Sequence, residues 1–192
     1  MKTVGVLALQ GDFAAHGAAV ERAGAKCVFV REREQLAGID GLILPGGEST
    51  TMLKLLQYEG LMEPLEEFGR RKPMFGTCAG AILMAAQVSM PEQESLGLVD
   101  MAVERNAYGR QIDSRITEIS PAPEFEKRTA PGKLEAVFIR APIIRSIGKD
   151  SKVLARYHGD PVWVEQGGHM VTTFHPELTQ DSRIHRRFLE SL

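Results

Sequence analysis

The sequence has 192 residues, of which 43% are hydrophobic and 25% charged, and its formal net charge is -2 at pH 7. This length fits a single domain whose core needs no disulfide or metal, and we expect residues 1–192 to form it. The charge balance argues against binding to nucleic acid or an anionic membrane, and no apolar run approaches the roughly 20 residues of a membrane span. Because the N-terminus also shows no charged-then-apolar leader, we expect a soluble, cytoplasmic protein.

Short apolar runs alternate with helix-like stretches in the first half of the chain. Runs rich in Val, Leu and Ile predict buried strands over residues 4–9, 26–30, 41–44 and 73–75. Helical spacing predicts helices over 13–24 and 51–68, the second with Ser49 or Thr50 as its N-cap. Such an alternation is typical of βαβ units and of a parallel sheet that is buried on both faces.

The second half of the chain has a different pattern. Short strands with alternating character recur over 98–119 and 136–173, which indicates an antiparallel portion added to the parallel sheet. The proline-containing segment 120–132 is predicted to be a surface loop. Near the C-terminus, three arginines are interpreted as the solvated face of a last helix: Arg183, Arg186 and Arg187.

Three loops directly follow predicted strands of the first half. They contain Gln10, residues 46–49 and Cys78. Because open parallel sheets bind ligands beyond the carboxyl ends of their strands, we expect these loops to gather on one edge.

The stretch Gly76-Thr77-Cys78-Ala79-Gly80 has the G-x-nucleophile-x-G pattern of a nucleophile elbow. In such an elbow, glycines on both sides allow a strand to turn sharply into a helix. The helix N-terminus favours the Cys78 thiolate, and the Ala79 amide points to where an oxyanion would form. The alternative interpretation is a core cysteine in a turn, and the pattern alone does not exclude it. For Cys27, which lies in an apolar run, a buried core position is the preferred interpretation.

Two further segments supply partners for Cys78. In the segment TTFHPEL, His175 and Glu177 are two residues apart, and in an extended chain they project to the same side, as a base and its orienting carboxylate do. In the segment LPGGEST, the Gly47 N–H is the candidate for a second oxyanion donor beside Ala79. Considered alone, TTFHPEL is more simply interpreted as a turn with a solvated charge, and LPGGEST as an ordinary strand-to-helix connection.

No metal or phosphate motif accompanies these residues. The remaining histidines show neither HxxxH nor cysteine-paired spacing: His16, His158, His169 and His185. The segment PGGEST lacks the GK[ST] ending of a phosphate-binding loop. We therefore expect neither a metal nor a cofactor.

The combination of FGTCAG, FHPE and PGGES resembles the class I glutamine amidotransferases, which use a Cys-His-Glu triad in this chain order. The blocks LALQGD, LILPGGESTTM, VERNAYGRQIDS, VFIRAP and TTFHPELT narrow the resemblance to the glutaminase subunits of pyridoxal phosphate synthase, and they span nearly the whole chain. The resemblance implies an α/β, doubly wound, mostly parallel and flavodoxin-like sheet that is flanked by helices and has an added antiparallel portion.

The resemblance also implies an activity and a partner. The family hydrolyses L-glutamine to glutamate and ammonia through a thioester on the cysteine, here Cys78, with His175 and Glu177 completing the triad. The ammonia passes to a separate TIM-barrel synthase subunit within a large hetero-oligomeric complex. The family pattern places substrate contacts at six positions: Gly47, Glu48, Ser49, Arg105, Ile139 and Arg140. Among these, Arg105 is the candidate for binding the α-carboxylate, because a guanidinium forms paired hydrogen bonds with a carboxylate.

Two other interpretations are weaker. The deglycase and intracellular peptidase-like proteins have a similar elbow, but a histidine follows their cysteine directly, where this chain has Ala79. A non-catalytic scaffold would not need Cys78 and His175 together with their supporting residues. The reactivity of the Cys78 thiol would separate a scaffold from an enzyme.

Overall fold

The computed structural model describes residues 1–106, 114–126 and 132–192. Its largest sheet has seven strands in the order β10-β11-β12-β4-β3-β1-β2. The strands from β12 to β2 are parallel to their neighbours, whereas β10 and β11 extend the sheet in antiparallel fashion. Their bounds are β1 Thr3–Leu7, β2 Lys26–Val30, β3 Gly41–Leu44, β4 Met74–Thr77, β10 Lys152–Tyr157, β11 Asp160–Gln166 and β12 His169–Thr172.

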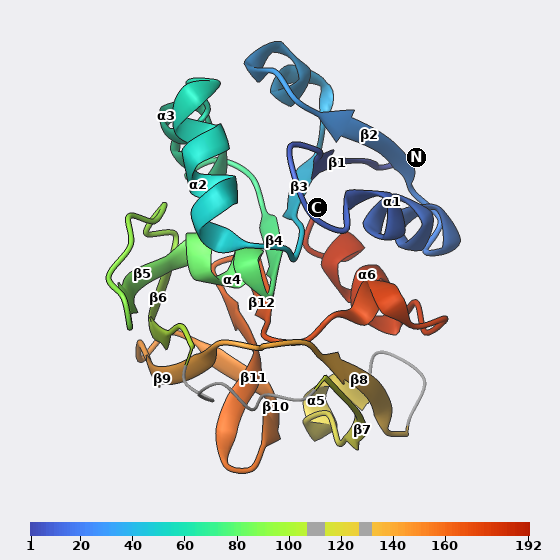
Figure 1. Ribbon diagram of the computed structural model, residues 1–192. Helices are drawn as coiled ribbons and strands as arrows, with labels where there is room; N and C mark the ends of the chain where they lie inside the picture. The colour runs from blue at the N-terminus through green and yellow to red at the C-terminus, as the bar shows by residue number, and fades with distance from the viewer. Residues whose placement is uncertain (107–113, 127–131) are drawn as a thin grey trace.

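Helices cover both faces of this sheet (Figure 1). Helices α2, α3 and α4 lie on one side, and α1 and α6 lie on the other. The helices are α1 Phe13–Arg22, α2 Ser49–Tyr58, α3 Met62–Gly69, α4 Ala79–Met84, α5 Pro123–Glu126 and α6 Arg183–Leu189. Successive strand residues therefore enter opposite cores: in β3, Leu42 and Leu44 pack with α2, while Ile43 packs toward α6. The predicted doubly wound α/β class is confirmed.

Two small sheets complete the second half. Strand β6 pairs in parallel with β5 and antiparallel with β9, and β7 pairs antiparallel with β8. These strands are β5 Ala85–Ser89, β6 Val99–Glu104, β7 Arg115–Ile119, β8 Leu134–Phe138 and β9 Ile143–Ile147. No helix within the described ranges is long and apolar enough to cross a membrane.

The predicted helix over 51–68 is wrong in two respects. It is two helices, because Gly60 adopts φ +65° between α2 and α3. In addition, the N-cap of α2 is Glu48 rather than Ser49 or Thr50, since its carboxylate accepts hydrogen bonds from the N–H groups of Thr50 (3.1 Å) and Thr51 (2.7 Å).

Three other predictions need correction. Cys27 is half-buried rather than a core residue, because β2 is the edge strand of the sheet. The segment 120–132 is not simply a surface loop, because it contains α5, whose Phe125 is fully buried; residues 127–131 lie outside the described ranges. The Arg187 side chain is only 8% exposed and is paired with Glu165 of β11, so it does not belong to a solvated helix face.

Candidate active site

Cys78 lies at the turn between β4 and α4. Its backbone adopts φ 49° and ψ -103°, a region rarely populated by residues with a side chain, and its N–H donates to the Thr172 carbonyl at 2.9 Å. The flanking glycines are required by close packing. A Cβ on Gly76 would lie 2.6 Å from the Gly80 backbone, and a Cβ on Gly80 would lie 2.0 Å from the Leu44 carbonyl oxygen. The sequence therefore folds here into the strained elbow that its glycines predict.

His175 and Glu177 follow β12, the strand that pairs with β4. Glu177 lies in the short 3₁₀ helix η3, Pro176–Leu178, rather than in an extended segment, but it still contacts His175, with Nδ1 and Oε1 separated by 2.7 Å. Burial alone would lower the pKa of His175. Hydrogen bonds and charge interactions with Cys78 and Glu177 instead raise the pKa to about 10. The site therefore favours a protonated imidazole beside Cys78.

The loop from Gly46 to Ser49 forms another wall of the site. A Cβ on Gly46 would lie 2.3 Å from Cε1 of His175, so only glycine lets the loop approach the imidazole this closely. Gln10, from the loop after β1, accepts a hydrogen bond from the Glu48 N–H at 3.2 Å. The three loops that follow β1, β3 and β4 thus meet at one edge of the sheet, as the chain order predicts.

These loops border a pocket of about 540 Å³, a size typical of small-molecule sites. Arg105 lines it at the end of β6, and its Nη2 lies 2.7 Å from Thr50 Oγ1 and 3.7 Å from Glu48 Oε1. Ile139 directs its carbonyl at Cys78 Sγ at 3.8 Å, and Arg140 adopts φ 46°. The pocket is lined by Asp12, Gly47, Glu48, Ser49, Cys78, Ile82, Arg105, Asn106, Ser114, Ile139, Arg140, Pro142 and His175.

The structure refines two of these assignments. The Glu48 carboxylate is engaged as the N-cap of α2, and Ser49 Oγ donates to Gln93 Oε1 at 3.0 Å. Both side chains are therefore hydrogen-bonded within the chain. The motif that contains Arg105 continues into residues 107–113, which lie outside the described ranges.

Sequence reasoning missed two residues near His175. Asp12 Oδ2 lies 3.8 Å from His175 Nδ1 at the rim of the pocket, and His16 Nε2 lies 3.4 Å from the second oxygen of Glu177. A signal for His16 was present, because it lies on the buried face of α1 together with Gly17, Ala19 and Val20. A histidine on an otherwise apolar helix face requires a polar partner.

The ligand atoms of Asp12, His175 and Glu177 lie within 4.8 Å of one another, and in the described ranges they form the one cluster that could hold a metal ion. However, the Nδ1 atom of His175 is already hydrogen-bonded to Glu177. A cation at this position would displace the contact that orients the imidazole.

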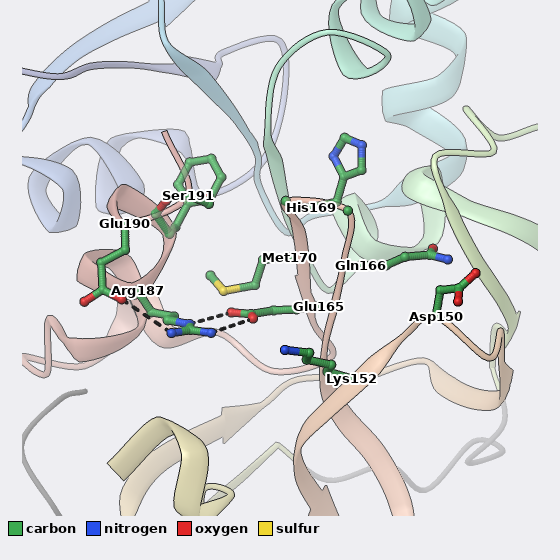
Figure 2. A pocket seen from close by; sticks show the side chains of 12 residues that line it. Asp150, Lys152, Glu165, Gln166, His169, Met170, Arg187, Glu190 and Ser191 are labelled. Atoms are coloured by element: carbon green, nitrogen blue, oxygen red, sulfur yellow. Dashed lines mark hydrogen bonds and ion pairs between the residues drawn. The ribbon is translucent and has the colours of Figure 1, made fainter. Parts of the chain in front are cut away.

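A second pocket, shown in Figure 2, lies at the opposite end of β12. Arg187 of α6, which lines this pocket, forms a bidentate ion pair with Glu165 of β11, with N–O distances of 2.8 and 2.9 Å. Lys152 also has a carboxylate partner, Glu124, at 3.2 Å. The two cations of this pocket are therefore both paired, and the Arg187–Glu165 pair joins α6 to β11 of the sheet.

The family of the chain follows from comparison with known proteins. The SNO glutamine amidotransferase family matches residues 6–192. The chain belongs to this family. This chain is 71% identical over 192 residues to the pyridoxal 5'-phosphate synthase subunit PdxT of Solibacter usitatus, and the match covers 100% of both chains. It is 52% identical over 187 residues to PdxT of Koribacter versatilis, covering 97% of this chain and 94% of that one.

A solved structure agrees with this assignment. A crystal structure of a glutamine amidotransferase superposes with a TM-score of 0.88 at 45% identity, covering 98% of this chain and 97% of that chain. The resemblance drawn from the sequence motifs is thereby confirmed.

Proposed function

We propose that this chain is the glutaminase subunit of a pyridoxal phosphate synthase, with residues 1–192 as one catalytic domain. The observation that carries the proposal is the convergence of Cys78, His175 and Glu177 at one edge of the sheet, with the first two lining one pocket. The family membership and the PdxT relatives support the same activity.

The proposed reaction begins with the Cys78 thiolate, which is stabilised by the protonated His175. The sulfur attacks the side-chain amide carbon of L-glutamine, and the resulting oxyanion accepts hydrogen bonds from the N–H groups of Gly47 and Ala79. His175 then protonates the departing nitrogen, the C–N bond breaks, and ammonia leaves behind a thioester. His175 next takes a proton from water, whose oxygen attacks the thioester carbon. The C–S bond breaks, which releases glutamate and restores the thiolate.

The remaining residues bind the substrate in this proposal. Arg105 pairs with the α-carboxylate, and Glu48, Ser49, Ile139 and Arg140 contribute mainly backbone groups, since the Glu48 and Ser49 side chains are engaged elsewhere. The ammonia is delivered to a TIM-barrel synthase subunit that builds pyridoxal phosphate from a pentose phosphate and a triose phosphate.

The test is ammonia release from L-glutamine by the full chain mixed with the synthase subunit. Cys78→Ala is expected to abolish release, whereas Cys27→Ala retains it, because burial and then the charge of Glu21 raise the pKa of Cys27 to about 11 and leave that thiol unreactive. Undiminished release by Cys78→Ala would exclude the mechanism. Equal inertness of both thiols toward alkylation would favour a scaffold.

A further inference from the structure

A row of buried polar side chains continues behind the catalytic pocket. His16 of α1 is fully buried, and its Nε2 lies 2.9 Å from Thr77 Oγ1 and 3.4 Å from Glu177 Oε2. Its other ring nitrogen, Nδ1, lies 3.1 Å from Nε2 of His185 on α6. Helices α1 and α6 lie side by side on the same face of the sheet (Figure 1), so the two imidazoles meet between them. The row runs inward from His175 through Glu177 and His16 to His185.

Glu177 needs a second partner. Its side chain has no solvent exposure, and a buried carboxylate is costly unless both of its oxygens are stabilised. Oε1 is engaged by His175 at 2.7 Å. Over the described ranges, Oε2 has no hydrogen bond of ordinary geometry, and His16 Nε2 faces it at 3.4 Å. Whether this contact is favourable depends on which His16 nitrogen carries the proton.

Burial keeps both inner histidines neutral at pH 7. Burial lowers the pKa of His16, although the negative charge of Glu177 acts to raise it. Burial also lowers the pKa of His185 to about 3. The charged or titratable groups that face the pair are Glu177, His175, Asp12 and Arg22. Each neutral imidazole carries one N–H, so two arrangements of protons are possible.

In one arrangement His16 carries its proton on Nδ1 and donates to His185. The lone pair on His16 Nε2 would then face the Glu177 carboxylate, and His185 would hold its own N–H on Nδ1, an atom with no partner among the residues described. In the other arrangement His185 donates from Nε2 to His16 Nδ1, and the His16 Nε2–H points toward Thr77 and Glu177. The second arrangement avoids both a repulsive contact and an unpaired buried donor.

We propose that His16 is a positioning residue for the catalytic carboxylate, that it presents a neutral Nε2–H to Glu177 Oε2, and that the hydrogen bond from His185 fixes this tautomer. The inference rests on the proposed Cys-His-Glu triad. A neutral donor suits the role, because it orients Glu177 without adding a cation. A lysine or arginine there would compete with the protonated His175 for the same carboxylate.

The kinetic test compares His16→Leu, which removes the N–H, with His16→Gln, whose side-chain amide N–H reaches a similar position. Ammonia release is measured with the synthase subunit present. His16→Leu is expected to lower kcat about tenfold, because the buried carboxylate oxygen loses the N–H that faces it at 3.4 Å, while KM for glutamine stays within about twofold. His16→Gln is expected to recover most of kcat. Equal loss in both variants would indicate a packing role and overturn the proposal.

The second readout is the pH dependence of Cys78 alkylation by iodoacetamide in the full chain. A poorly oriented Glu177 stabilises protonated His175 less, so in His16→Leu the alkylation profile is expected to shift to higher pH. The matched control is His169→Leu, at the far end of β12, where His169 Nδ1 accepts a hydrogen bond from the Met74 N–H. It is expected to cost stability but to leave the profile in place. An unshifted profile in His16→Leu would contradict the proposal.

The third readout uses the wild-type chain, so it does not require that any variant folds. Nitrogen-15 NMR of the histidine-labelled wild-type chain is expected to show both inner histidines neutral and protonated on Nε2. Protonation of His16 on Nδ1 would overturn the inference. A wild-type chain that releases no ammonia even with the synthase would instead count against the proposed function, and the NMR result would stand apart from it.

Discussion

Gly80 of α4 approaches β3 so closely that any side chain at this position would meet the Leu44 carbonyl oxygen. This contact fixes the first turn of the helix that follows Cys78, and with it the direction of the Ala79 N–H. The packing of two glycines, rather than a property of the cysteine itself, sets the geometry of the elbow.

Gly80→Ala is therefore expected to destabilise the fold by about 1–3 kcal/mol or more and to reduce glutaminase activity at least tenfold, since the added Cβ must displace β3 or α4. Urea unfolding and ammonia release measure the two effects. Gly38→Ala is the control, because a Cβ at Gly38 meets nothing within 4 Å. A Gly80→Ala variant as stable and active as Gly38→Ala would refute the packing argument.

Stability is expected to depend on pH through His175. Its folded-state pKa of about 10 lies above the ordinary value near 6.5, so its contribution to stability is complete below pH 6.5 and is lost as the pH rises through 10. The free energy of unfolding is compared between the wild type and His175→Gln. The advantage of the wild type should shrink from pH 7 toward pH 10. A difference that stays constant over this range would show that His175 is not held as the cation.

Arg105→Ala is expected to raise KM for glutamine about 10- to 100-fold, because in the proposed binding mode the α-carboxylate loses a charge-assisted hydrogen-bond partner. Arg105→Lys should restore part of the affinity, since it keeps the charge but not the planar fork. The exposed Arg156, which bonds only to the Gly159 carbonyl among the residues described, gives the control Arg156→Ala. An unchanged KM in Arg105→Ala would assign the carboxylate to another residue.

The Arg187–Glu165 pair is expected to stabilise the docking of α6. The two side chains are 8% and 19% exposed, so Arg187→Met or Glu165→Gln alone should each cost about 1.5–3 kcal/mol in urea unfolding. The double variant should lose less than the sum of the two single losses. The exposed pair Arg70–Glu66 is the control, and its removal should cost under about 1 kcal/mol. Equal costs for both pairs would contradict this role for Arg187.

The sequence was most informative where a local pattern decides the structure. Strand β3 is a continuous apolar run, β4 begins with the apolar pair Met74-Phe75, and the elbow glycines are recognisable by their spacing around Cys78. Local patterns gave the wrong prediction where the burial of a side chain depends on residues distant in the sequence. Arg187 is buried because Glu165 lies on a strand that α6 packs against, and Cys27 is half-exposed because the sheet ends at β2.

His16 illustrates the same limit at the site. No histidine or cysteine lies at metal-ligand spacing from His16, so no sequence motif marks this residue. Its surroundings arise when α1, α6 and η3 pack together, which brings His185 and Glu177 to it from the far end of the chain.

The pairing of β4 with β12 has a consequence for the order in which the site is completed. The proposed nucleophile Cys78 and the glycine loop belong to the first half of the sequence, but the proposed base His175 and its carboxylate Glu177 belong to the second half. During synthesis, a nascent chain exposes Cys78 long before it possesses His175. If the proposed mechanism holds, Cys78 lacks its imidazolium partner on the ribosome, and its catalytic reactivity begins only when β12, the last parallel strand, joins the sheet.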